Sequence, residues 1–377
     1  MGKVRRCSLF YSLKECNAFR EPSNDLLAWK GTLSKQQREA SDTIIASIKE
    51  NEDRLLWAVT GAGKTEMLFE GIAYALKEKK RVCIASPRVD VCLELAPRIQ
   101  AAFPNTKLAV LYGGMDEPYS YTPLVIATTH QLYRFKEAFD VLIIDEIDAF
   151  PYHSDKSLQF AANKARKTES SLIYLSATPS PDMQKQVEKN KLQSTILPAR
   201  YHGHPLPVPK YVWCTDWRKK VLKAPLKTSF GKMVAEKIAA KKRFLIFVPN
   251  IEWMLACEKV LQKQFPNIPF AAVSAEDINR KEKVQGMREN QFLFLISSTI
   301  LERGVTFPNI DVLVIGAEDS VFTESALVQI AGRCGRSPDF PTGEVLFYHD
   351  GKSIAMKKAV KQIKKMNKLA KSRGLIQ

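Results

Sequence analysis

The chain has 377 residues, 45% of them hydrophobic, which predicts about two globular domains and excludes a wholly disordered chain. Its formal net charge of +17 predicts a polyanionic partner, either nucleic acid or an anionic membrane surface. No apolar run reaches the roughly 20 residues that a membrane-spanning helix needs, and seven cysteines are scattered as in proteins with reduced thiols. We therefore expect a cytoplasmic protein without a transmembrane segment.

The first part of the chain, residues 1–32, shows little periodicity and contains Cys7 and Cys16, with no histidine nearby. Two ligands cannot complete a tetrahedral zinc site, so isolated cysteines are the favoured interpretation. A zinc site completed by residues from outside this chain is the alternative. A helical pattern follows, with Ser34 as its cap. In this helix Gln37 is interpreted either as a contact to an adenine edge or as a solvated residue.

Residues 55–65 predict a strand, a tight phosphate-binding loop and the start of a helix. Glycines let the backbone turn sharply, so that successive N–H groups point at one anion beside the positive end of the helix. Lys64 would reach the terminal phosphates and the Thr65 hydroxyl would ligate Mg²⁺. Ala58 takes the position of the first glycine of the full pattern, so an ordinary glycine-rich turn is the alternative. The loop reads Thr60, Gly61, Ala62, Gly63, Lys64, Thr65.

Continuous apolar runs alternate with helical patterns in this half of the chain, which predicts a parallel sheet covered on both faces. Ligands of such sheets bind outside the carboxyl ends of the strands. Ser86, Arg88, Thr128 and Thr129 fall at such ends. The expected strands lie in residues 81–88, 108–111, 124–127, 141–144 and 172–175.

An acidic motif, residues 145–148, follows one of these strands directly. Buried carboxylates without partners are costly, so they need a cation. Asp145 would hold Mg²⁺, and Glu146 would polarise the attacking water. An acidic helix cap is the alternative, and the phosphate loop upstream disfavours it. Ser176 and Thr178, after the next strand, are candidates to hydrogen-bond this motif and report its state; a simple turn is the alternative.

The proline content rises next, and residues 201–210 are predicted to form a semi-rigid connector. Its two histidines, His202 and His204, are interpreted as loop residues, with metal binding as the alternative. A second α/β pattern follows, with strands expected at residues 244–248, 270–273, 292–296 and 312–315.

The second half carries no phosphate loop but has two closely spaced arginines, Arg333 and Arg336. Three residues apart at the start of a helix, they would lie on one face. Arginine grips phosphate oxygens in a fork geometry, so the pair is predicted to complete an ATP site as arginine fingers. A surface ion pair is the alternative.

The tail, residues 351–373, has eight lysines, one arginine and no acidic residue, about half of the net charge. Apolar residues recur through it and predict a basic amphipathic helix. This helix would pack on the second domain and show its charge to DNA. A solvated helix face and a membrane-surface role are the alternatives.

The order of these motifs resembles the superfamily 2 helicases and translocases across about residues 33–337, and Ala58 is usual for that superfamily. Three stretches, residues 29–34, 145–152 and 201–209, resemble the ComFA family of late competence proteins, with PriA-type helicases next. The resemblance implies two RecA-like parallel-sheet domains, residues 33–200 and 211–377, with ATP and Mg²⁺ in the cleft between them.

The resemblance also implies a role for each motif. Gln37 would contact adenine and residues 60–65 would bind phosphates and Mg²⁺. Single-stranded DNA would cross both domains on the other side, with Ser176 and Thr178 coupling it to the ATP site. The catalytic set is Lys64, Asp145, Glu146, Gln329, Arg333, Arg336. The nucleic-acid set is Pro87, Arg88, Thr128, Thr129, Thr299, Arg303, Gly304.

Members of the ComFA family help to bring single-stranded DNA across the cytoplasmic membrane, so the resemblance implies an ATP-driven translocase at its inner face with competence-machinery partners. Such proteins carry a four-cysteine zinc module ahead of the motor. Only Cys7 and Cys16 lie in residues 1–32, which would be a remnant of that module, and we expect no zinc in this chain. A PriA-like strand-separating helicase and a nucleotide-gated DNA-binding scaffold without turnover are the alternatives.

Overall fold

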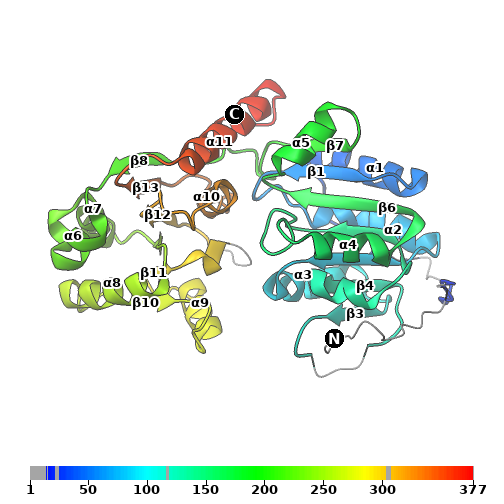
Figure 1. Ribbon diagram of the computed structural model, residues 1–377, viewed down its shortest axis with the longest axis horizontal. Coiled ribbons are helices and arrows are strands. Elements are labelled where there is room, and N and C mark those ends of the chain that lie inside the picture. Colours follow the sequence, from blue (N-terminus) through cyan, green and yellow to red (C-terminus); the bar gives the residue numbers. More distant parts are fainter. Residues whose placement is uncertain (1–13, 15, 22–24, 116–118, 303–306, 377) are drawn as a thin grey trace. The chain divides into compact units, whose positions relative to one another are not determined.

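The computed structural model describes residues 14, 16–21, 25–115, 119–302 and 307–376. The chain folds as two compact units, one of Met1–Ala58 with Ala62–Leu197 and one of Val59–Gly61 with Pro198–Gln377. Each unit is built on its own parallel sheet, with helices packed against it (Figure 1). The predicted α/β class with two parallel-sheet domains is confirmed.

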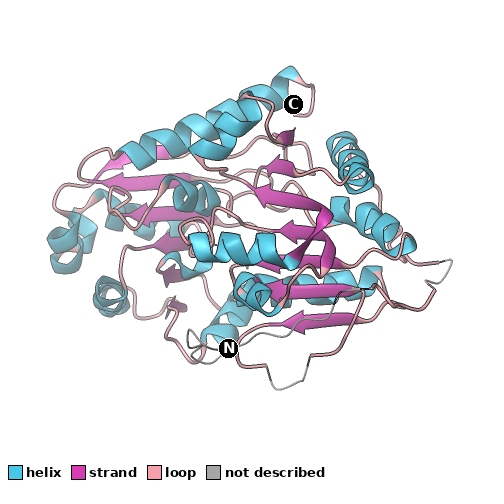
Figure 2. Cartoon of the chain, turned by 45° about the vertical axis from the view of Figure 1, so that its right-hand side comes forward, coloured by secondary structure: helices cyan, strands magenta, loops and turns pink. Residues whose placement is uncertain are grey.

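Within the described residues, the first unit has a seven-stranded sheet in the order β3-β4-β2-β5-β6-β1-β7. Strands β2 and β4 are buried along their whole length, which is why their sequences are continuous apolar runs. Figure 2 shows the strands in magenta with helices in cyan beside them. The strands are β1 (Arg54–Ala58), β2 (Val82–Ser86), β3 (Leu108–Leu111), β4 (Leu124–Thr128), β5 (Phe139–Ile144), β6 (Arg166–Ser176) and β7 (Gln193–Leu197). The helices are α1 (Lys35–Glu50), η1 (Glu66–Leu68), α2 (Phe69–Lys77), α3 (Val89–Ala102), η2 (Thr129–Arg134), α4 (Lys156–Ala165) and α5 (Pro181–Glu188).

The second unit has a six-stranded sheet among its described residues, in the order β10-β11-β9-β12-β13-β8. Its strands are β8 (Lys210–Trp213), β9 (Phe244–Phe247), β10 (Phe270–Val273), β11 (Phe294–Ser297), β12 (Asp311–Ile315) and β13 (Val345–His349). Its helices are α6 (Trp217–Lys223), η3 (Pro225–Lys227), α7 (Ser229–Ala239), α8 (Ile251–Gln264), α9 (Arg280–Arg288), η4 (Thr299–Glu302), α10 (Glu324–Ala331) and α11 (Ile354–Ser372).

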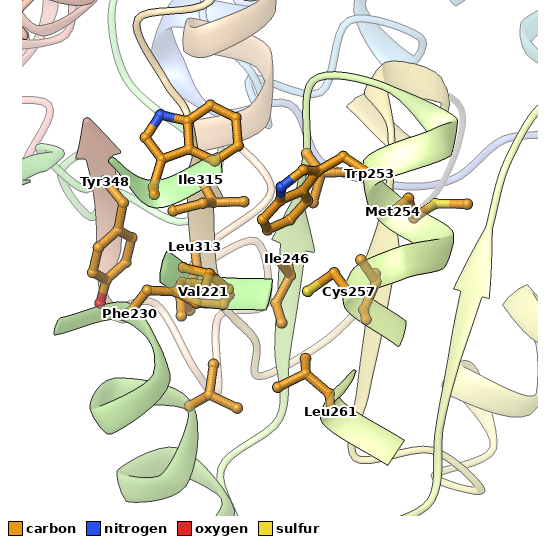
Figure 3. Packing of buried hydrophobic residues seen from close by; sticks show 14 of the residues in the cluster. Val221, Phe230, Ile246, Trp253, Met254, Cys257, Leu261, Leu313, Ile315 and Tyr348 are labelled. Carbon is orange, nitrogen blue, oxygen red and sulfur yellow. The ribbon is translucent and has the colours of Figure 1, made fainter. Parts of the chain in front are cut away.

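A buried apolar cluster fixes the central strands of the second unit (Figure 3). Ile246 of β9 and Leu313 of β12 pack beneath helix α8, which contributes Trp253. The Trp253 ring lies 5.2 Å from that of Trp217, edge to face, and its indole N–H donates to the Arg218 carbonyl at 3.1 Å. Each large apolar side chain buried in this way contributes about 1.5–3 kcal/mol to folding. The cluster therefore holds rigid the strands whose carboxyl ends carry the candidate site residues of this unit.

One predicted element is wrong. Arg333 and Arg336 do not stand at the start of a helix, because α10 ends at Ala331 and both arginines lie in the turns that follow. Gly332 is the C-cap residue of the helix. Gly335 has a φ of +66°, a backbone conformation that residues with a Cβ rarely adopt. The glycines thus end the helix and present the arginines from a turn.

The basic tail is helical as predicted, over Ile354–Ser372. Its apolar side chains from Met356 to Ala370 are buried, except for the partly exposed Leu369, and its lysines are exposed. No helix in the described ranges is both long enough and apolar enough to span a membrane.

Candidate active site

The candidate residues that follow the strands of the seven-stranded sheet gather at one edge of that sheet. All its strands run parallel, so their carboxyl ends share an edge. The phosphate loop follows β1, Arg88 follows β2, Thr129 follows β4, Asp145 follows β5 and Thr178 follows β6. The structure therefore brings together motifs that are up to about 120 residues apart in sequence, as ligand sites of parallel sheets require.

Gln37 holds the phosphate loop from helix α1. Its Nε2 donates to the carbonyls of Ala62 at 3.1 Å and Gly63 at 3.2 Å, while its Oε1 accepts from the backbone N–H of Ser34 at 2.9 Å. The side chain is only 5% exposed, so the alternative of a solvated helix residue is wrong. Contact of Gln37 with adenine stays a prediction.

Gly63 is required at its position for two reasons. Its φ of +74° lies in the left-handed region, and a Cβ there would overlap the Gln37 amide. The loop is therefore shaped by the glycine and fastened by the glutamine. The sequence signal for that fastening was Gln37 three residues after the Ser34 cap, the spacing of a capping box.

Asp145 is the buried acid of the site. Burial raises the pKa of its carboxyl to about 6, while the charge of Lys64 opposes that rise. The Lys64 Nζ lies 3.9 Å from Asp145 Oδ1, too long for a hydrogen bond but close enough for strong attraction at low dielectric. The Asp145 backbone N–H donates to the Ala85 carbonyl at 2.8 Å, which ties the acid to strand β2.

Glu146 has a left-handed backbone, with a φ of +55°. This conformation costs a residue with a Cβ about 1–2 kcal/mol, and such residues cluster at functional sites. The Glu146 backbone N–H donates to Asp145 Oδ1 at 2.8 Å, which helps to hold the turn.

The residues at this edge suit Mg²⁺, which prefers oxygen ligands and keeps most of its shell for water and phosphate. The Thr65 hydroxyl and the Asp145 carboxylate supply such oxygens, and both side chains are largely buried. The part of the chain that the structure describes holds no group of three or more His, Cys, Asp and Glu side chains suited to a metal.

The residues considered as metal ligands in the sequence are Cys7 and Cys16, for zinc, and the histidines His202 and His204, for an unspecified metal. Cys16 is exposed and its Sγ donates to the Lys14 carbonyl at 3.4 Å, while Cys7 lies outside the described residues. His202 accepts at Nδ1 from the His204 backbone N–H at 3.2 Å, which closes a local turn.

Ser176 and Thr178 make the expected hydrogen bonds to the acidic motif, at its last residue. Ser176 Oγ donates to Asp148 Oδ1 at 2.7 Å and Thr178 Oγ1 donates to Asp148 Oδ2 at 2.8 Å. The end of β6 is thereby fastened to the turn that carries Asp145 and Glu146. Their role in coupling stays a prediction.

The candidate nucleic-acid residues differ in exposure. Arg88 caps helix α3 and is partly exposed, whereas Pro87, Thr128 and Thr129 are buried at the strand ends. In the second unit Thr299 begins η4, and Arg303 and Gly304 lie outside the described residues. Contact of this set with nucleic acid stays a prediction.

In the second unit, Arg333 is held by a backbone carbonyl. Its Nε and Nη2 donate to the Glu302 carbonyl at 2.9 and 2.6 Å. Gln329 is buried on α10, and Arg336 donates from Nε to the Gly332 carbonyl at 3.1 Å. The structure thus brings these three residues to the end of one helix, and their action on ATP stays a prediction.

Sequence reasoning missed Arg200. This residue follows β7 and is 1% exposed, with its guanidinium donating to the carbonyls of Cys334 at 2.7 Å, Gly332 at 3.4 Å and Gly335. No local pattern marks it, because its partners lie more than 130 residues away.

The fold and the site define a nucleotide-hydrolysing protein of the superfamily 2 helicase and translocase class. Residues 30–181 match the family described as "Type III restriction enzyme, res subunit", and residues 228–338 match "Helicase conserved C-terminal domain". Dbp5 of S. cerevisiae, solved with RNA and ADP BeF3, has the same fold: the TM-score is 0.61 at 12% identity, over 89% of this chain and 92% of that one.

Two relatives identify the family within this class. Competence protein ComFA of Bacillus subtilis (strain 168) is 48% identical over 98% of this chain and 79% of its own length. Competence protein ComFA of Streptococcus pneumoniae (strain ATCC BAA-255 / R6) is 43% identical over 93% of this chain and 80% of its own. The chain belongs to the ComFA family, as its motifs predicted.

We predict that Gln37→Glu weakens binding of every nucleoside triphosphate by about tenfold or more. The variant keeps an acceptor for the Ser34 N–H but loses the donors to Ala62 and Gly63, and an unmet buried carbonyl costs about 1–3 kcal/mol. Titration with fluorescent ATP and GTP analogues measures this. Loss of ATP affinity alone would instead indicate that Gln37 reads adenine, and unchanged affinity for both would contradict the support role.

Proposed function

We propose that this chain is an ATP-dependent translocase of single-stranded DNA that serves DNA uptake in natural transformation. The observation that carries the proposal is the pairing of Lys64 with Asp145 at the edge where the phosphate loop ends, in a chain of the ComFA family. Both relatives are named competence proteins, and the charge of +17 suits a polyanionic track.

In the proposed cycle, backbone N–H groups of residues 61–65 bind the phosphates, and Lys64 neutralises their charge. Glu146 accepts a proton from the attacking water. Mg²⁺, when bound through Thr65 and Asp145, supplies charge neutralisation at the phosphates. Lys64 lies 3.9 Å from Asp145 Oδ1 and would also reach the phosphates, so it would hold the two negative groups in one site.

The second unit completes the reaction in this proposal. Gln329, Arg333 and Arg336 act on the ATP held by the first unit, because guanidinium groups stabilise the charge that develops in phosphoryl transfer. The residues after β2, β4 and β11 contact the DNA backbone. Binding and release of ATP then move one unit along the strand, at the inner face of the cytoplasmic membrane with other competence proteins as partners.

We predict that Lys64→Ala and Glu146→Gln each lower DNA-stimulated ATP hydrolysis by at least about a hundredfold, because the first removes the cation at the phosphates and the second removes the base that accepts the proton of the attacking water. Glu146→Gln should still bind ATP, since the amide keeps the size of the side chain, whereas Lys64→Ala should bind it weakly. Phosphate release and nucleotide titration measure the two properties. Arg38→Ala, which breaks an exposed ion pair with Glu70, is the control. Undiminished turnover in both site variants would refute the function.

Helix α11 provides a second DNA contact in this proposal. Five lysines recur every three or four residues and form one stripe about 21 Å long at a rise of about 1.5 Å per residue. These are Lys357, Lys361, Lys364, Lys368, Lys371, all exposed. The apolar side chains from Met356 to Ala370 pack inward. The outward face thus has charge but no apolar face to insert into lipid, which favours a phosphate backbone over a membrane.

We predict that changing Lys357, Lys361, Lys364 and Lys368 to Gln weakens single-stranded DNA binding and flattens its salt dependence. The slope of log affinity against log salt should fall in magnitude by about 0.7 for each phosphate that the variant no longer neutralises. The control removes the same charge elsewhere on the second unit, at the exposed Lys219, Lys220, Lys223 and Lys227. Equal effects of both variants would mean that only total charge matters. If the α11 variant keeps its affinity for DNA but no longer binds anionic vesicles, the partner of helix α11 is a membrane surface and not DNA.

A further inference from the structure

Arg200 is a buried cation that has only carbonyl groups as partners in the hydrogen bonds described above. Its three acceptors, Gly332, Cys334 and Gly335, all lie in the turn after helix α10. A buried charge without a carboxylate is costly unless other groups compensate it. The carbonyl end of a helix carries partial negative charge and compensates here. Such a costly arrangement indicates that the position of this turn is important.

The turn held by Arg200 is the one that carries Arg333 and Arg336. Arg200 Nη2 and Arg336 Nε donate to the same acceptor, the Gly332 carbonyl, at 3.4 and 3.1 Å. The two guanidinium groups are thus neighbours, and burial together with the charge of Arg336 lowers the pKa of Arg200 to about 10. Movement of the Gly332 carbonyl would move Arg336 with it.

A second contact from the same segment reaches the turn. Since Nδ1 of His202 accepts from the His204 N–H, its Nε2 carries the proton and donates to the Gly335 carbonyl at 3.2 Å. Gly335 is needed in this turn for another reason: its φ is +66°, and a Cβ there would overlap the backbone carbonyl of Pro341. The segment after β7 therefore stabilises the turn of residues 332–335 through hydrogen bonds from Arg200 and His202 to several of its carbonyls.

We propose that Arg200 is a positioning residue for Arg336: by fixing the turn of residues 332–335 it sets the direction of the Arg336 guanidinium toward the reacting phosphate. This inference rests on the proposed function, in which Arg336 acts on ATP. Arg200 itself binds carbonyls and acts only through that turn. The segment after β7 thus belongs to the catalytic apparatus of the second unit.

A double-mutant cycle in the full chain tests the inference, with Arg200→Ala, Arg336→Ala and the double variant. We expect Arg200→Ala to lower kcat for ATP, with single-stranded DNA present, by about 10–100-fold, as misplacement by about 1 Å does. KM should change by less than about threefold, because ground-state binding is retained. The double variant should be no slower than Arg336→Ala alone, because the two act as one unit.

The matched control is Arg243→Ala. Arg243 also donates to backbone carbonyls, those of Met287 and Pro308, but it stands at the amino edge of the same sheet. At a temperature at which both Arg200→Ala and Arg243→Ala are folded, Arg243→Ala should leave kcat unchanged. An undiminished kcat in Arg200→Ala, or an equal further loss of kcat when Arg200→Ala is added to Arg336→Ala, would overturn the inference.

Hydrogen exchange gives a readout that does not depend on activity. The backbone N–H groups of Gly332, Arg333 and Cys334 donate to α10 carbonyls and should be protected. Arg200→Ala should speed their exchange by at least about tenfold, about 1.4 kcal/mol of local stability, and Arg243→Ala should not. Unchanged exchange in Arg200→Ala would refute the claim that Arg200 stabilises the turn, whatever the activity of the variant. If the wild-type chain does not hydrolyse ATP, the proposed function is refuted. Faster exchange in Arg200→Ala would still show, in that case, that Arg200 stabilises the turn.

Discussion

The interaction on which the candidate site depends is the one between Lys64 and the buried Asp145. Burial alone would favour the neutral acid, and the lysine 3.9 Å away favours the charged one. The two residues come from different strands, so their meeting depends on the register of a parallel sheet with β6 between β1 and β5. The sheet core therefore has a chemical role as well as a structural one, because it keeps opposite charges close in a place with little water.

The surrounding hydrogen bonds can be understood as ways of keeping that edge fixed. Gln37 fastens the phosphate loop from α1, and Asp148 receives Ser176 and Thr178 from the neighbouring strand. The second unit uses the same kind of solution, with backbone carbonyls as the acceptors. Glu302 holds Arg333, and the turn at Gly332–Gly335 is held by Arg200. In both units the groups proposed to meet phosphate are held by neighbours that do not themselves react.

Much of this architecture was predictable from sequence, because central parallel strands are apolar on both faces and their ends carry the polar residues. Strands β2, β4 and β12 show this directly. The edge strand β7 does not: it begins with the polar residues Gln193, Ser194 and Thr195, and it was not predicted. The motifs identified the candidate residues, but they did not predict the hydrogen bonds that hold those residues in place. The Arg200 contacts span more than 130 residues, a distance over which no local pattern carries information. The helix start expected at Arg333 was wrong because Gly332 ends α10 and Gly335 takes a left-handed backbone.

Phosphate release by the purified wild-type chain, with single-stranded DNA, duplex DNA or RNA as activator, tests the central claim most directly. If ATP hydrolysis at the Lys64–Asp145 edge drives movement along single-stranded DNA, that activator should raise the rate by at least about tenfold, a barrier change of about 1.4 kcal/mol, and more than duplex DNA does. A rate that none of the three activators changes would contradict the account.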